Sequence, residues 1–233
     1  MNRERAILAA IALATFAASA AGAASYAKRV YDLQARVNEQ NAVLEAPQAR
    51  LMEELMWNRT KIGGPFTLTD HTGRKRALAD FRGRFTLLYF GFTNCPDVCP
   101  TDLYSMSKAI EELGPDGEKV NLVFVTLDPE RDTPEKLSQY ISLFHPRLVA
   151  LTGTPGEIRN AANLYKVYFQ KAKLGPGAND YTVDHSAFVY LLNPEGRYLG
   201  FYPPNTSPDR IAQIVRQWLQ EKSANRSPET SPN

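Results

Sequence analysis

One stretch, residues 87–103 (LLYFGFTNCPDVCPTDL), constrains this chain more than any other. Its apolar, aromatic-rich first part predicts a buried strand. The chain's two cysteines, Cys95 and Cys99, follow in a loop, and a helix is predicted just afterwards. Pro96 and Pro100 disfavour helical dihedrals for the cysteines before them, so we expect both thiols on a constrained loop or an irregular first turn. The partial positive charge at a helix start favours thiolate over thiol.

The composition limits the classes of protein that fit this chain. It has 233 residues, of which 43% are hydrophobic, and this is enough for one domain with a core that needs no disulfide scaffold. The net charge is +2 and there is no long basic run, so we expect no nucleic-acid partner. Two cysteines within five residues therefore indicate a functional pair rather than a structural framework.

The N-terminal segment predicts export. Residues 6–27 carry no charge, and as a helix they would measure about 33 Å, enough to span a bilayer. We expect a retained membrane anchor; the alternative is a cleaved secretory signal, because the segment is rich in alanine and offers small-residue cleavage sites. No arginine-rich transit region precedes it, which favours a bacterial envelope. We expect a bacterial inner-membrane protein with a cytoplasmic N-terminus and the folded domain in the periplasm.

We divide the chain into four parts. Residues 1–29 form the anchor or signal segment, 30–61 a partly helical linker, 62–222 the folded domain, and 223–233 a disordered polar tail. In the folded domain we expect a small hairpin at 66–78, strands at 85–92, 120–127, 148–151, 187–192 and 197–202, and helices at 101–113, 133–144, 154–164 and from 207. A further short strand is possible at 167–170, and residues 171–179 predict an exposed loop.

This order of elements predicts an α/β fold of three layers with a mixed central sheet. In a thioredoxin-like version of that fold, the strand at 85–92 delivers its cysteines to the carboxyl edge of the sheet, where open α/β sheets place their sites. In the same fold, the segment that contains His185 lies beside the cysteine loop.

Soft thiolates can bind a soft metal such as Cu(I), and imidazole suits both copper oxidation states. Of the three histidines, His71 lies in a polar turn and His145 at a helix end, and both positions have ordinary structural explanations. His185 heads an apolar strand. On residue types alone, a core or capping histidine and a metal ligand both stay open for it, and a plain Cys95–Cys99 disulfide is also credible.

Three motifs resemble those of the Sco/SenC copper proteins. They are GFTNCPDVCPT at 91–101, LDPERDTP at 127–134 and VDHS at 183–186, and the resemblance extends from about Gly64 to Leu219. It implies a thioredoxin fold, a membrane tether, and copper, as Cu(I) or Cu(II), held by Cys95, Cys99 and His185. The family usually has histidine where this chain has Asn94; that position is not a family ligand, so we expect copper binding to persist.

The resemblance also implies a role and partners. The role is that of a metallochaperone that delivers copper to, or matures, the binuclear copper site of cytochrome c oxidase subunit II. Another periplasmic copper chaperone is a possible donor. The alternatives are a thiol–disulfide oxidoreductase that reduces the acceptor's cysteines, a copper or redox sensor and, less well supported, a thiol peroxidase. Three residues between the cysteines, where the usual redox motif has two, argue mildly against a general oxidoreductase.

Acidic residues near the motifs have structural explanations on sequence grounds. Asp184 adjoins His185 on an extended segment, so its side chain is expected to point to the opposite face, as a hairpin-stabilising or outer residue. Asp128, Arg131 and Asp132 follow a central strand. We expect them to shape a turn and cap the next helix, with orientation of the site as the alternative.

Overall fold

The computed structural model describes residue 28, residues 61–177 and residues 180–224. The chain divides into two units, Met1–Thr60 and Lys61–Asn233, and the second contains the folded domain. The predicted anchor (1–29), nearly all of the linker (30–61) and most of the tail (223–233) lie outside the described residues. Among the helices of the described residues, none has the length and hydropathy to cross a bilayer.

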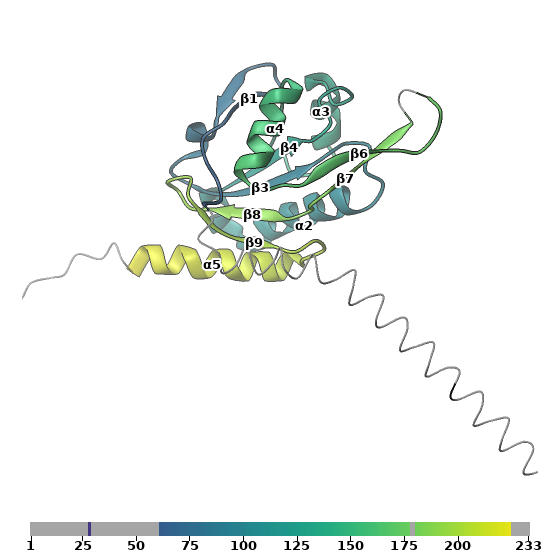
Figure 1. The fold of residues 1–233 in the computed structure, drawn as a ribbon. Helices are drawn as coiled ribbons and strands as arrows, with labels where there is room; N and C mark the ends of the chain where they lie inside the picture. The colour runs from purple at the N-terminus through teal and green to yellow at the C-terminus, as the bar shows by residue number, and fades with distance from the viewer. Residues whose placement is uncertain (1–27, 29–60, 178–179, 225–233) are drawn as a thin grey trace, which may run out of the picture. The chain divides into compact units, whose positions relative to one another are not determined.

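A seven-stranded mixed sheet forms the centre of the domain (Figure 1). The strand order is β2-β1-β5-β4-β3-β8-β9, and β3 pairs parallel with β4 and antiparallel with β8. Its strands are β1 (Thr67–Asp70), β2 (Lys75–Ala77), β3 (Phe85–Gly91), β4 (Val120–Thr126), β5 (Leu148–Thr152), β8 (Val189–Leu192) and β9 (Tyr198–Tyr202). The predicted α/β arrangement around a mixed central sheet is confirmed.

Strand β3 is buried along its whole length because both faces of the sheet are covered. On one face the Tyr89 ring stacks on Phe124 of β4 at 6.3 Å between centroids. On the other face Phe90 packs against Tyr165 at 5.6 Å and Tyr190 at 6.0 Å. Aromatic pairs of this kind add to the free energy gained from area burial. The strand that precedes the cysteines is therefore the rigid centre of the domain.

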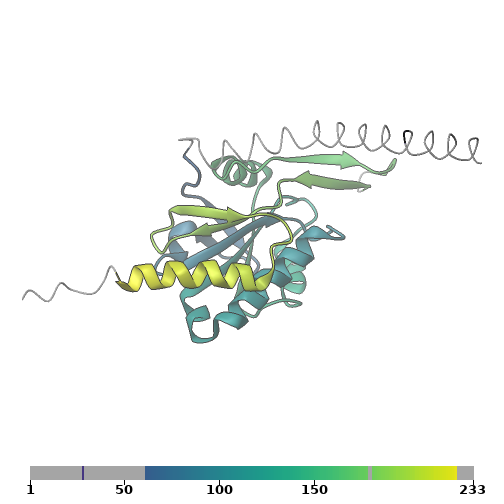
Figure 2. The same cartoon turned by 90° about the horizontal axis from the view of Figure 1, so that it is seen from below.

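Helices cover both faces of the sheet (Figures 1 and 2). Helix α2 packs beside α5 on one side, and α3 lies on that side too, since its Tyr140 packs on the Phe124 ring. Helix α4 ends at Tyr165, which packs on the opposite face. The bounds are α2 (Val98–Leu113), α3 (Pro134–Ile141), α4 (Pro155–Leu164) and α5 (Pro208–Ala224), with short 3₁₀ turns η1 (Leu78–Phe81) and η2 (Gly114–Lys119).

A separate two-stranded hairpin stands apart from the main sheet. It consists of β6 (Phe169–Lys173) and β7 (Tyr181–His185), paired antiparallel, and it extends outward in Figures 1 and 2. The prediction of an exposed loop from residue 171 is wrong at 171–173, which belong to β6. His185 ends β7 rather than heading the strand that follows, because residues 186–188 belong to no strand and β8 begins at Val189.

Helix α2 begins at Val98, three residues earlier than predicted, and so contains Cys99 in its first turn. Pro100 is tolerated there because the amides of the first turn have no intrahelical partner. The start is irregular: Asp97 has φ −139° and ψ −79°. Cys99 therefore occupies an irregular first turn, while Cys95 lies on the loop before it.

Gly91 ends β3 directly beneath the site. A Cβ atom there would lie 2.8 Å from Cys99 Sγ and 2.9 Å from a ring carbon of Tyr89, both part of the packed interior. We expect Gly91→Ala to lower the free energy of unfolding by about 1–3 kcal/mol, measured by urea denaturation, because overpacking forces the neighbours to shift. Gly200→Ala in β9 is the matched control, since a Cβ atom at that position would meet nothing within 4 Å. Equal stability of the two variants would contradict this account.

Candidate functional site

Three segments bring the predicted ligands to one edge of the sheet. Cys95 lies on the loop after β3, Cys99 in the first turn of α2, and His185 at the end of β7. Cys99 is fully buried and Cys95 is half-buried. Both thiols are free. The site thus combines an accessible sulfur with an inaccessible one.

His185 reaches the thiol pair from 86 residues along the chain. Its Nε2 lies 3.7 Å from Cys99 Sγ, and its Nδ1 lies 3.2 Å from the Val183 carbonyl oxygen. Because a carbonyl can only accept, Nδ1 carries the ring proton and Nε2 presents its lone pair to the sulfur. The ring also packs edge-on against Phe92, and burial lowers the pKa of His185, which keeps the imidazole neutral.

The two thiols have opposite ionisation behaviour. A hydrogen bond with Cys99 is the largest cause that lowers the pKa of Cys95, to about 6, and the backbone amides of 97–99 add to it. The same hydrogen bond, together with burial, raises the pKa of Cys99 far above its ordinary value. At neutral pH the accessible Cys95 is therefore a thiolate and the buried Cys99 is a thiol.

The single proton of Cys99 faces two acceptors, the Cys95 thiolate and the lone pair of His185 Nε2. Two sulfurs and one imidazole nitrogen are the donor set that suits copper. As the side chains stand, no group of three His, Cys, Asp or Glu residues within 61–177 and 180–224 is arranged to hold a metal ion.

A buried carboxylate supports the cysteine loop. Asp132 is fully buried, and it accepts hydrogen bonds from the Thr93 backbone N–H at 3.0 Å, from Thr93 Oγ1 at 2.5 Å and from Thr126 Oγ1 at 2.6 Å. The expectation that Asp128, Arg131 and Asp132 cap the next helix is wrong, because Thr133 is the N-cap of α3 and its hydroxyl accepts from the Lys136 N–H. Asp132 instead connects the β4–α3 loop to the residue two positions before Cys95.

A second buried carboxylate supports the hairpin that carries His185. Asp128 accepts from the Tyr181 hydroxyl at 2.7 Å and pairs with Arg131, whose guanidinium stacks 3.7 Å from the Tyr181 ring centroid. These residues also form the predicted turn, since Asp132 N–H donates to the Asp128 carbonyl. The LDPERDTP motif was the one sequence signal for these two carboxylates. It did not identify their partners, because Thr93 lies 39 residues from Asp132 and Tyr181 lies 53 residues from Asp128.

The other candidates lie outside this site. His71 Nδ1 accepts a hydrogen bond from the Ala150 N–H, and His145 Nδ1 accepts from the Arg147 N–H. His71 is half-buried. Asp184 is exposed, as the alternation of side chains along β7 predicts. Asn94 accepts a hydrogen bond from Lys136 Nζ at 2.6 Å.

Comparison with known families agrees with the motifs. The family model SCO1/SenC matches residues 56–220, most of the chain. The chain belongs to the SCO1/SenC family. "Protein sco1" of Schizosaccharomyces pombe is 38% identical over 180 residues, which cover 76% of this chain and 68% of that protein. Other relatives are longer: the chain spans 59% of the human SCO2 homolog and 51% of an Arabidopsis thaliana homolog.

Solved members of the family share this fold. The structure of Bradyrhizobium japonicum ScoI with copper bound is 40% identical, covers 67% of this chain and 99% of its own, and superposes with a TM-score of 0.62. BsSco is 26% identical, covers 68% of this chain and 94% of its own, and has a TM-score of 0.53. BsSco is described as having a disulfide switch and as a member of the Sco family of cytochrome c oxidase assembly proteins. These matches confirm the thioredoxin-like form of the α/β fold.

The difference between the thiols predicts a pH profile for alkylation. Because Cys95 becomes a thiolate as the pH rises through about 6, its reaction with iodoacetamide should reach half its maximal rate near that pH. Cys99→Ala removes the hydrogen bond that stabilises the thiolate, and the midpoint should move up toward about 8.5, the ordinary value for cysteine. Mass spectrometry of the alkylated peptide measures both rates. An unchanged midpoint in Cys99→Ala would show that Cys99 does not set this pKa.

Proposed function

We propose that this protein is a copper metallochaperone that binds copper through Cys95, Cys99 and His185. The observation that carries the proposal is the 3.7 Å contact between His185 Nε2 and Cys99 Sγ, which presents a nitrogen lone pair to the thiol pair. Copper would take the place of the proton that Cys99 now shares between its two neighbours. Copper-bound structures of relatives that share the fold support this chemistry.

The exposure of the site suits a protein that releases its metal. Cys95 is half-buried and already ionised near neutral pH, so an incoming thiolate from an acceptor can exchange with it first. Cys99 is fully buried and would be exchanged later. Two thiolates and one imidazole also leave copper with an open coordination position.

We further propose that the acceptor is the binuclear copper site of cytochrome c oxidase subunit II, with another periplasmic copper chaperone as a possible donor. The link of the Sco family to assembly of this oxidase supports the acceptor. The uncharged segment at residues 6–27 supports a tether in the bacterial inner membrane, with the N-terminus in the cytoplasm and the folded domain in the periplasm.

A second candidate function rests on the difference between the thiols. A nucleophilic Cys95 thiolate beside a protonated Cys99 is the arrangement of a dithiol reductant. Cys95 would attack an acceptor disulfide to form a mixed disulfide and release one acceptor thiolate. Cys99 would then attack Cys95, which leaves a Cys95–Cys99 disulfide and releases the second acceptor thiolate. The acceptor gains two electrons, and this chain loses them.

Copper titration of the reduced full-length chain tests the first proposal. We expect one copper ion per chain in both oxidation states. Cys95→Ser and Cys99→Ser should weaken Cu(I) binding at least about 100-fold, since even residues that only support metal ligands are worth about 10–100-fold. His185→Ala should weaken Cu(II) binding by a similar factor. His71→Ala is the matched control, because His71 lies outside the site. Binding of both copper states by His185→Ala at wild-type affinity would contradict the three-ligand site.

Trapping of the mixed disulfide tests the second candidate. The metal-free, reduced Cys99→Ser variant should accumulate a mixed disulfide with an oxidised, disulfide-bonded dicysteine peptide, because the residue that resolves it is missing. Cys95→Ser should form none, since the remaining Cys99 thiol is buried and protonated. Non-reducing mass spectrometry measures both adducts. If Cys99→Ser forms no adduct, the reductase hypothesis is wrong, whereas the copper proposal is unaffected.

A further inference from the structure

The β4–α3 loop, residues 127–133, contributes no side chain to the proposed ligand set, yet it contacts both segments that do. We call it the bracket loop. It begins where β4 ends, on the central part of the sheet, and its own turn is closed by the Asp128 carbonyl, which accepts from the Arg131 and Asp132 N–H groups. Asp128 and Asp132 are both fully buried. Two carboxylates removed from water are costly unless their oxygens are satisfied, so their partners define what the loop does.

One arm of the bracket loop holds the cysteine loop. Asp132 accepts from both the backbone N–H and the hydroxyl of Thr93, and Lys136 lies 3.4 Å from the same carboxylate. Lys136 also donates to Asn94, the residue immediately before Cys95. Thr93 is therefore bonded directly to the bracket loop, and Asn94 is bonded through its side chain to Lys136 of the helix that follows that loop.

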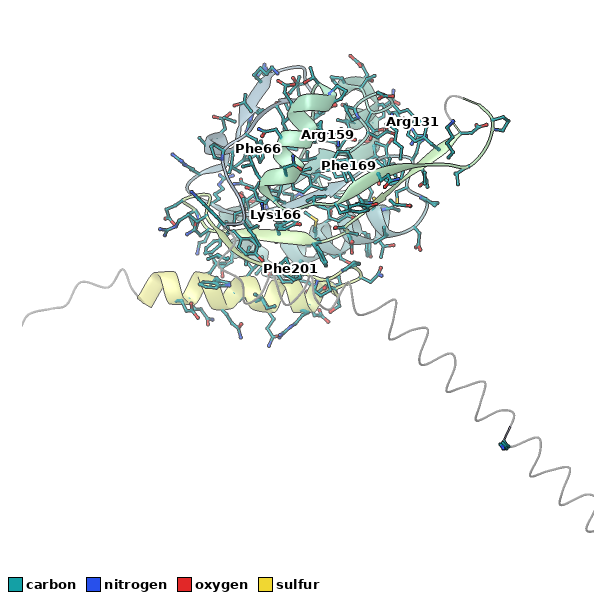
Figure 3. All side chains as sticks on the ribbon, in the orientation of Figure 1. Phe66, Arg131, Arg159, Lys166, Phe169 and Phe201 are labelled. Atoms are coloured by element: carbon teal, nitrogen blue, oxygen red, sulfur yellow. The ribbon has the colours of Figure 1, made fainter. Side chains whose placement is uncertain are left out.

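The other arm holds the hairpin. Tyr181, the first residue of β7, donates its hydroxyl to Asp128, accepts at its carbonyl from Arg131 Nη1 at 3.0 Å and stacks its ring on the same guanidinium. Arg131 lies beside the hairpin in Figure 3. Lys171 of β6 pairs with Glu130 of the bracket loop at 2.7 Å. Since β6 and β7 pair only with each other, these contacts fix the hairpin to the domain at the end far from His185.

We propose that the bracket loop sets the distance between the thiol pair and His185 by holding the cysteine loop through Asp132–Thr93 and the hairpin through Asp128–Tyr181–Arg131. Tyr181 and Thr93 are positioning residues: neither belongs to the ligand set, and each fixes one ligand-bearing segment to the same rigid loop. The expected changes in copper affinity rest on the proposed copper function. The expected changes in hydrogen exchange and in the His185 shifts rest only on the geometry of the metal-free chain.

The two arms should affect copper differently. Cu(I) accepts low coordination by thiolates, whereas Cu(II) relies more on the imidazole. Loosening the hairpin displaces His185 and should weaken Cu(II) binding selectively. Loosening the cysteine loop displaces Cys95 and should weaken binding of both copper states. A general loss of stability would not produce this split.

Tyr181→Phe tests the hairpin arm. It removes the hydroxyl bond to Asp128 and keeps the ring on Arg131. We expect amide hydrogen exchange in β6 and β7 of the metal-free chain to accelerate about tenfold, the size expected for one hydrogen bond to a charged group. The ring ¹⁵N shifts of His185 should change. Cu(II) affinity should fall about tenfold and Cu(I) affinity by less than about twofold.

Tyr168→Phe is the matched control. Tyr168 directly precedes β6, and its hydroxyl donates to Gln170 rather than to Asp128, so the same chemical change leaves the contacts of the bracket loop intact.

Thr93→Val tests the contact between the bracket loop and the cysteine loop. It removes the hydroxyl bond to Asp132, keeps the side-chain shape, and should weaken both copper states by a similar factor. Thr206→Val is its control, because the Thr206 hydroxyl donates to the nearby Pro203 carbonyl rather than to Asp132.

The proposal is overturned if Tyr181→Phe and Tyr168→Phe show the same amide hydrogen exchange in the hairpin and the same ring ¹⁵N shifts of His185. Equal losses of Cu(I) and Cu(II) affinity in Tyr181→Phe would also overturn it, because the effect would then not act through His185. A wild-type chain that binds neither copper state overturns the proposed function alone. In that case faster hairpin exchange in Tyr181→Phe than in Tyr168→Phe still supports the bracket, and equal exchange overturns it.

Discussion

The site depends on one contact between segments 86 residues apart, the approach of His185 Nε2 to Cys99 Sγ. Neither partner is free to adjust much. Cys99 is buried in the first turn of α2, above a strand whose two faces are both packed, and the imidazole is held by the Val183 carbonyl and the Phe92 ring. The distance between His185 Nε2 and Cys99 Sγ therefore depends on how accurately the β6–β7 hairpin is positioned against the main sheet.

Buried polar groups supply that accuracy. Asp128 and Asp132 lie in the interior, where unpaired carboxylates would be strongly destabilising. Each has a local partner and a distant one: Arg131 and Tyr181 for the first, Thr126 and Thr93 for the second. Hydrogen bonds have stricter geometry than apolar contacts, so such a network specifies orientation where hydrophobic packing would specify only proximity.

The same arrangement suits both functions proposed for the thiols. The hydrogen bond with Cys99, aided by the backbone amides of 97–99, lowers the pKa of Cys95, and the same hydrogen bond together with burial raises the pKa of Cys99. A thiolate is both the ligand that copper requires and the nucleophile that opens a disulfide. The proposed metal binding and the proposed redox chemistry would therefore exclude each other, because a Cys95–Cys99 disulfide would remove two of the three proposed donors.

Local sequence patterns determined the features that depend on neighbouring residues: the apolar strand before the cysteines, the helix predicted at 154–164, and the strands predicted at 187–192 and 197–202. The interpretation of His185 as a metal ligand came from a family resemblance, since residue types left it open. Only the tertiary structure decided that residues 171–173 form a strand, and that Asp132 reaches Thr93 rather than capping a helix. Such features have no short-range signal, because their energy comes from contacts that exist only once distant segments have packed together.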